Sequence, residues 1–299
     1  MLELFINGTN GFMPTKDHHL CSIALRYNGK IAILDCGEGT QVAFSKSKWS
    51  YKSIDLIYIS HGHADHLLGL PGLLLSMHNC GRTEKVTILG SAYVKKHINA
   101  AINMIGDIFN FPLEFIPIDE PTITAFFWND LQLSFIKLRH YPQCYGIKFI
   151  TCRKPKFNTE KAMKNNVPMK IWNSLLKNNS ITYDGRKYTV EEISDPDGKT
   201  PIVFCYIPDT MYCLNKINNF IKGSDLTIME CMYPNKNSLA NQNDKLHMCY
   251  EDVRNFGEST DRLGLIHFSP AVSRKNYHLT SPYHFLCKDS KFITLNFKD

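Results

Sequence analysis

No stretch of about 18 consecutive apolar residues, the length of a transmembrane helix, occurs in this 299-residue sequence. Its start, MLELFINGTNG, lacks the basic residues, the apolar core and the small-residue cleavage site of a signal peptide. The ten cysteines include no C-x-x-C pair, and a chain of this length needs no disulfide staples. We therefore expect a cytoplasmic protein without a membrane partner, whose cysteines are reduced and mostly buried.

The sequence also lacks a strong charge imbalance, an internal repeat and any low-complexity tract. Its 34 Lys and Arg residues against 28 Asp and Glu residues give a net charge of +6, which permits a polyanionic partner without requiring one. The length exceeds that of a usual single domain, but one layered α/β domain with an insertion can reach it.

Short runs rich in β-forming residues alternate with segments of helical periodicity. The first strands are expected at 21–27, 30–35, 54–60 and 86–90, with helices after His66 and at 91–105. A second series of strands is expected at 131–138, 144–150, 201–207, 225–230, 262–268 and 291–297. Two series of strands with helices between them predict an α/β sandwich of two sheets covered by helices.

Between the strands expected to end at 150 and to begin at 201, the composition becomes rich in lysine and asparagine. Residues 152–177 contain seven Lys or Arg and a single Glu, a local charge equal to that of the whole chain. We interpret 152–199 as an inserted segment within a single domain spanning 1–299. Charge alone is equally consistent with a solvated surface loop.

Three histidines and an aspartate crowd into the stretch SHGHADH at 60–66. His61 and His63 follow an apolar strand, and Gly62 between them allows a tight turn at the strand end. Asp65 and His66 fall where the next helix begins. Four such side chains in H-x-H-x-D-H order can supply ligands to two metal ions.

A dinuclear site needs more ligands than these four, and other strand ends offer them. His140 follows the strand at 131–138, Asp209 follows the one at 201–207, and His267 ends the one at 262–268. Together the set contains five imidazoles and two carboxylates, ligands that suit Zn²⁺, with Mn²⁺ or Fe²⁺ possible.

The stretch HGHADH at 61–66 is the signature of the metallo-β-lactamase superfamily. Its continuation, DHLLGLPGLL at 65–74, resembles ribonuclease Z, the endonuclease that trims tRNA 3′ ends, and DCGEGTQ at 35–41 is similar to that family's first βα turn. The resemblance implies a four-layer αββα sandwich with metal ions at one rim. It also implies cleavage of the 3′ trailer of precursor tRNA by an activated water, leaving a 3′-hydroxyl.

Carried over by position, the resemblance assigns two Zn²⁺ ions to the seven ligands. His61, His63 and His140 would hold one ion, Asp65, His66 and His267 the other, and Asp209 would bridge them. Asp65 would also accept a proton from the attacking water. Glu230 in IMECMY and His247 in KLHMCY partly match the family's H-E-A-T and H-S-T positions; there the histidine helps to protonate the leaving 3′ oxygen and the glutamate orients it.

The expected substrate contacts depart more from the family pattern. Residues 14–19 read PTKDHH where the family tends to have P-x-K-x-R-N, so Lys16 persists and the arginine does not. The segment VPMKIWNSLLKNN is similar to the family's tRNA-binding arm without its glycines. Basic side chains there would contact tRNA phosphates, and we expect this role for Lys154, Lys156, Lys161, Lys164 and Lys170. Phe157 and Trp172 either stack on bases or pack the arm.

Two other functions remain open at this point. The same fold and metal chemistry could act on a small phosphodiester or thioester, since fold does not fix substrate. The chain could also be a non-catalytic RNA-binding protein with a structural metal site, although such a protein has no need of an open dinuclear centre. The resemblance further implies a homodimer in which the arm of one subunit holds the tRNA that the other cuts.

Overall fold

The computed structural model describes residues 1–103, 106, 108–118, 126–152, 155–196, 198–238 and 246–298. The chain divides into two compact units. The larger unit contains Met1–Ile150 and Ile202–Asn296, and the smaller contains Thr151–Pro201 and Phe297–Asp299. In the described part of the chain, none of the helices combines the length and apolar character needed to cross a membrane.

The larger unit is built on two seven-stranded sheets. Strands of the first sheet, in spatial order, are β18 (Lys291–Leu295), β1 (Leu2–Gly8), β2 (Ser22–Tyr27), β3 (Lys30–Leu34), β4 (Ile54–Tyr58), β5 (Val86–Gly90) and β6 (Leu113–Pro117). Strands of the second sheet are β17 (His284–Leu286), β16 (Leu263–Ile266), β15 (Leu226–Glu230), β14 (Val203–Ile207), β9 (Tyr145–Thr151), β8 (Leu131–Lys137) and β7 (Phe126–Trp128).

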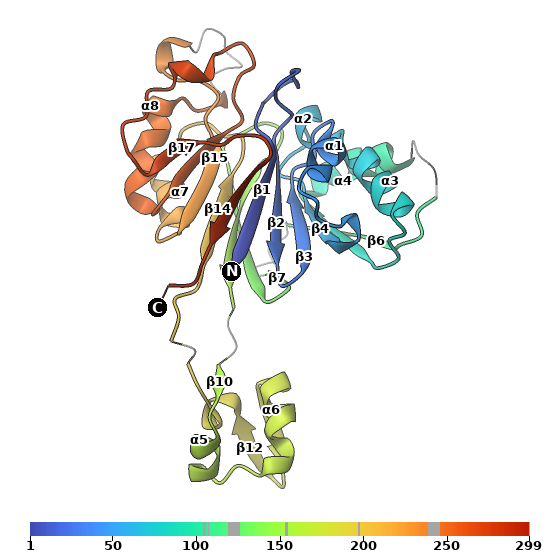
Figure 1. Ribbon diagram of the computed structural model, residues 1–299, viewed down its shortest axis with the longest axis vertical. Coiled ribbons are helices and arrows are strands. Elements are labelled where there is room, and N and C mark those ends of the chain that lie inside the picture. Colours follow the sequence, from blue (N-terminus) through green and yellow to red (C-terminus); the bar gives the residue numbers. More distant parts are fainter. Residues whose placement is uncertain are drawn as a thin grey trace. The chain divides into compact units, whose positions relative to one another are not determined.

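Helices cover the outer face of each sheet, giving the four-layer αββα sandwich expected from the sequence (Figure 1). Those beside the first sheet are α1 (Thr40–Ser45), α2 (Ala64–Leu67), α3 (Leu70–Asn79) and α4 (Ala92–Asn103). Those beside the second sheet are α7 (Leu214–Ile221) and α8 (Tyr250–Val253). Apolar side chains fix both pairs of layers: Leu73 and Ile98 pack on the first sheet, and Ile217 and Val253 pack on the second.

Two details differ from the sequence-based expectations. The strand expected at 291–297 was grouped with the second series, but β18 pairs antiparallel with β1 in the first sheet. The helical segment after His66 is divided into α2 and α3, because the chain passes tightly against the preceding loop at Gly69. A Cβ atom there would lie 1.9 Å from the carbonyl oxygen of Gly37, so only glycine permits this approach.

The smaller unit has its own apolar core, formed by buried residues that include Ala162, Leu175 and Ile193. Its helices are α5 (Thr159–Lys164) and α6 (Trp172–Asn178). Its strands are β10 (Lys156–Phe157), β11 (Ser180–Tyr183), β12 (Arg186–Thr189) and β13 (Ser194–Asp195), paired as β10 with β13 and β11 with β12. The segment 152–199 thus lies within a unit that packs on itself.

The parallel strands direct the chain toward one rim of the larger unit. β3 to β6 run parallel in the first sheet, and β14 to β17 run parallel in the second. The carboxyl ends of parallel strands meet at a common edge of their sheet, which is where α/β proteins place their sites. The loops that follow β4, β14, β15 and β16 carry most of the histidines and carboxylates singled out in the sequence. Of the others, Glu230 is the last residue of β15, and His140 follows the antiparallel strand β8.

Candidate metal centre

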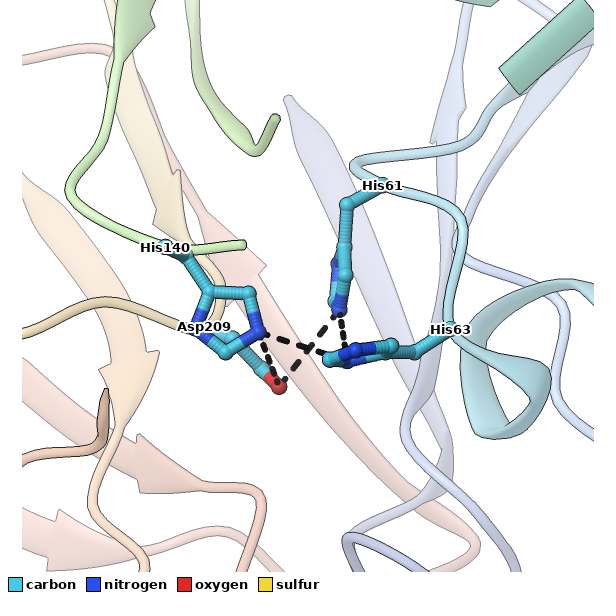
Figure 2. Close-up of side chains that lie close together, drawn as sticks. All are labelled: His61, His63, His140 and Asp209. Atoms are coloured by element: carbon cyan, nitrogen blue, oxygen red, sulfur yellow. Dashed lines mark hydrogen bonds and ion pairs between the residues drawn. The ribbon is translucent and has the colours of Figure 1, made fainter. Parts of the chain in front are cut away.

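Four side chains converge at the rim from three separate loops (Figure 2). His61 and His63 follow β4, His140 follows β8, and Asp209 follows β14. The Nε2 atom of His61 lies 2.9 Å from Nδ1 of His63, which lies 3.3 Å from Nε2 of His140. Oδ2 of Asp209 lies 3.6 Å from His61 Nε2 and 3.8 Å from His140 Nε2. The four donor atoms therefore surround one small volume.

A second group lies on the other side of the same aspartate. The Nε2 atoms of His66 and His267 are 3.2 Å apart, and Asp65 Oδ2 lies 3.3 Å from His267 Nε2 and 3.6 Å from His66 Nε2. Oδ1 of Asp209 lies 3.4 Å from His66 Nε2 and 3.3 Å from His267 Nε2. Asp209 therefore presents one carboxylate oxygen to each group, and all seven residues singled out in the sequence lie together.

Burial makes this concentration of charge costly without a compensating ion. Burial alone would raise the pKa of Asp209, but the imidazoles of His267, His66 and His61 outweigh it and hold the pKa well below its ordinary value. Burial lowers the pKa of His61 far below normal and that of His140 to about 4. These two imidazoles are therefore neutral near pH 7, the form in which histidine binds metal.

The donor set fits a metal cofactor. Asp209 Oδ1 is buried and has no hydrogen-bond partner among the described residues, an arrangement that costs free energy unless another group satisfies the oxygen. Neutral imidazoles and carboxylates are ligands of Zn²⁺ and of other first-row metals. Three overlapping sets of these residues bring their donor atoms within 4.8 Å of one another, two of them through Asp209. The protein is suited to hold a metal ion here.

Asp35 is a site residue that the sequence analysis did not single out. Its Oδ2 accepts hydrogen bonds from His66 Nδ1 at 2.8 Å, from Ser60 Oγ at 2.9 Å and from Tyr206 Oη at 2.8 Å, while Oδ1 accepts from the Ser60 N–H at 2.7 Å. A carboxylate on the second nitrogen of a ligand histidine fixes the tautomer and the ring orientation. The DCGEGTQ stretch contained the sequence feature that could have identified Asp35, since it places a carboxylate directly after a strand.

Glu230 and His247 also lie at the rim, as a pair. His247 Nδ1 lies 3.2 Å from Glu230 Oε2, and Glu230 Oε1 accepts the N–H of Thr210 at 2.5 Å. Burial alone would lower the pKa of His247, but the Glu230 carboxylate outweighs it and raises the pKa to about 9. His247 Nδ1 lies 3.8 Å from Asp209 Oδ2. A histidine oriented by a carboxylate beside the ligand cluster is arranged to deliver a proton there.

The expected substrate-binding lysines lie in different surroundings. Lys16 is exposed in the loop after β1. In the smaller unit, Lys156, Lys164 and Lys170 are exposed, and Lys170 Nζ lies 4.6 Å from the ring centroid of Tyr183. Lys154 lies outside the described residues.

Lys161 differs from the other lysines because it holds the smaller unit together. Its Nζ donates to the Ser194 carbonyl oxygen at 2.8 Å and to Asp195 Oδ1 at 3.0 Å. Trp172 also packs against this unit's core, and its Nε1–H donates to the Val167 carbonyl oxygen at 2.9 Å. Phe157 is 40% exposed with its ring centroid 5.1 Å from that of Trp172. Trp172 therefore contributes to the core of the smaller unit, whereas part of the Phe157 side chain is accessible to solvent.

Comparisons with known proteins relate this chain to two described families. A family model described as anti-Pycsar protein Apyc1 matches residues 2–177. Ribonuclease Z of Clostridium botulinum (strain Eklund 17B / Type B) is 36% identical over 318 residues, covering 98% of this chain and 100% of the relative.

Solved structures show the same fold. Human tRNase Z, short form, superimposes with a TM-score of 0.67 at 19% identity, over 98% of this chain and 99% of that one. The metallo-β-lactamase fold protein YhfI from Bacillus subtilis gives a TM-score of 0.68 at 14% identity, over 98% of each chain. The chain thus has the metallo-β-lactamase fold. It belongs to the family that the Apyc1 model describes and, along its whole length, to the ribonuclease Z family.

Proposed function

We propose that this protein is a metal-dependent endoribonuclease that removes the 3′ trailer of precursor tRNA and leaves a 3′-hydroxyl. One observation carries the proposal: five imidazoles and the Asp65 carboxylate converge around Asp209 in a chain 36% identical to a ribonuclease Z over nearly its full length. We further infer that it acts in the cytoplasm as a homodimer, with the smaller unit as the tRNA-binding arm.

The ligand set is suited to two Zn²⁺ ions, with Mn²⁺ or Fe²⁺ as alternatives. His61, His63 and His140 would hold one ion, Asp65, His66 and His267 the other, and Asp209 would be shared by both. Bound metal supplies positive charge that makes a water molecule acidic and stabilises charge on the phosphoryl oxygens.

The protein's own side chains move the protons. Asp65 accepts the proton of the attacking water, and its Oδ2 is held in place by the Phe12 N–H at 2.9 Å. As the bond between phosphorus and the 3′ oxygen breaks, His247 gives a proton to that oxygen, and Glu230 orients the imidazole. The products are a 3′-hydroxyl on the tRNA and a 5′-phosphate on the trailer.

The phosphates of the substrate require basic contacts outside the metal centre. Lys16 in the loop after β1 and the arm lysines Lys154, Lys156, Lys164 and Lys170 are the side chains we assign to this role. Lys161 is assigned to it only in part, because its Nζ already binds Asp195. Contacts of this kind give affinity and position without reading sequence.

A cleavage assay on 3′-extended precursor tRNA, with metal analysis of the same sample, tests the proposal. The purified protein should carry close to two transition-metal ions per chain, as its seven ligands suggest, and chelation should abolish cleavage. Asp65→Asn should keep the thermal melting profile and slow single-turnover cleavage by about 10²-fold or more. Intact cleavage by protein that contains no metal would refute the metal chemistry.

Hydrolysis of a small phosphodiester is the second candidate, because the loop at 14–19 has His18 where the family tends to have arginine. Loss of that arginine removes a fork of donors suited to phosphate. Activity on a chromogenic phosphodiester with none on precursor tRNA would favour this candidate over the first.

A further inference from the structure

Gly11 and Phe12 lie directly against side chains of the metal centre. A Cβ atom on Gly11 would lie 2.5 Å from Cε1 of His267, so the backbone lies against that imidazole and no larger residue fits there. The Gly11 N–H donates to the Phe268 carbonyl oxygen at 3.0 Å. This part of the loop is therefore held in place beside the ligand histidine from two sides.

Phe12 has an unusual backbone conformation. Its φ is 62°, in the left-handed region that bulky residues adopt only at a cost in free energy. In this conformation its N–H donates to Asp65 Oδ2 at 2.9 Å. A glycine would make the same hydrogen bond without the steric cost, so the hydrogen bond does not explain why phenylalanine is present.

The Phe12 side chain does not serve the core either. It is 52% exposed, and its recorded ring contact is with His247, at a centroid distance of 5.7 Å and an interplanar angle of 79°. An edge-on contact of this kind covers at most one face of the phenylalanine ring. The protein thus keeps a strained residue whose aromatic face is open to solvent, next to the two side chains that we assign to proton transfer.

We propose that Phe12 is the platform on which a base of the substrate stacks, specifically the base of the nucleotide whose 3′ oxygen leaves. This inference rests on the proposed function. When the scissile phosphodiester binds between the two ligand groups, its leaving oxygen lies at His247. The ribose that carries this oxygen then places its base beside the Phe12 ring. Aromatic side chains bind bases by stacking without strong sequence preference, which suits an enzyme that acts on many tRNAs.

Phe12→Gly isolates the ring, because glycine keeps the left-handed backbone and the N–H that binds Asp65. The matched substrates are a precursor tRNA with a base on the last nucleotide before the cleavage site, and the same RNA with an abasic ribose there. The wild-type protein should cut the first about tenfold faster or more, measured as kcat/KM. Phe12→Gly should bring this ratio close to one, and Phe12→Leu should leave it well below the wild-type value.

Met13→Ala is the control, since Met13 is 57% exposed in the same loop and should keep the wild-type ratio. A Phe12→Gly protein that keeps the wild-type ratio would overturn the proposal. Equal loss on both RNAs would also overturn it, because that result indicates a structural role through His247 or Asp65. The melting temperature of Phe12→Gly should not fall, since the substitution relieves the backbone.

Failure of the proposed function gives a different result, namely no cleavage of either RNA by the wild-type protein. In that case, stacking is tested by measuring how strongly inhibitors slow the hydrolysis of bis-p-nitrophenyl phosphate. Phe12→Gly should weaken inhibition by adenosine 3′-phosphate by about tenfold relative to inhibition by inorganic phosphate. An unchanged ratio of the two inhibition constants would exclude stacking on Phe12.

Discussion

Several imidazoles of the candidate metal centre are oriented by hydrogen bonds to the ring nitrogen that faces away from the site. His66 Nδ1 meets Asp35 Oδ2 at 2.8 Å, His61 Nδ1 meets Ser60 Oγ at 3.0 Å, and His140 Nδ1 lies 3.3 Å from the Leu246 carbonyl oxygen. Each contact leaves Nε2 to face the shared volume. Partners of this kind make the site rigid before any ion enters.

We predict that Asp35→Asn weakens metal binding about 10-fold to 100-fold, the range typical of lost partners of ligand histidines. The amide nitrogen cannot accept. If it takes the place of Oδ2, both His66 Nδ1 and the Ser60 hydroxyl lose their acceptor, and if it takes the place of Oδ1, the Ser60 N–H loses its acceptor. Competition with a chromogenic chelator measures the affinity. Tyr206→Phe is the graded control, because it removes one donor to the same oxygen and keeps the bond to His66. Equal affinity in Asp35→Asn and the wild-type protein would contradict the role.

Strand positions were predictable where an apolar run was bounded by turn-forming residues. The expected strand at 54–60 became β4 (Ile54–Tyr58), and the one at 86–90 became β5 (Val86–Gly90). β1 (Leu2–Gly8) was not predicted, although it lies inside the first sheet. Its sequence, LELFING, has one charged residue and ends in a polar turn, which gives weak alternation. Pairing with β2 and β18 stabilises it, and such tertiary pairing overrides local propensity.

Charge at the arm could be read from the sequence, whereas the arm's internal structure could not. The short strands β10 to β13 have two to four residues each, too few to show a period. Lys161 appeared equivalent to its neighbours in the sequence, but its ion pair with Asp195 depends on the folded β10–β13 pair. Lys164 and Lys170 are exposed and are therefore the better test of a tRNA-binding role.

The double variant Lys164→Gln with Lys170→Gln should weaken precursor-tRNA binding. Each lost phosphate contact should also make the slope of log affinity against log salt shallower by about 0.7–0.9. Hydrolysis of a small phosphodiester should stay within a few-fold of the wild-type rate. The matched control is Lys216→Gln with Lys222→Gln, which removes two exposed lysines from the larger unit. Identical salt slopes in both double variants would exclude the arm as a phosphate clamp.

The candidate metal ligands come from distant parts of the sequence: His61 and His267 are separated by 206 positions. Spacing predicted that His61 through His66 act together, because they lie in one turn and the start of one helix. It could not show that Asp209 reaches both groups, since that depends on how the two sheets pack. The Tyr206–Asp35 hydrogen bond joins β14 to the end of β3, so the sandwich itself aligns the two halves of the metal centre.

The proposed dimer, in which each arm serves the partner's site, can be tested by combining two different variant subunits. Asp65→Asn subunits have intact arms and impaired sites, whereas Lys164→Gln/Lys170→Gln subunits have intact sites and weakened arms. If each arm serves the partner's site, co-expressed mixed dimers join an intact arm to an intact site, and trailer cleavage should recover to about a quarter of the wild-type rate for random pairing. If each arm serves its own site, the intact arm belongs to the impaired subunit and no recovery follows. Sedimentation should give the mass of two chains, and a monomer that cleaves precursor tRNA at the full rate would exclude the shared arrangement.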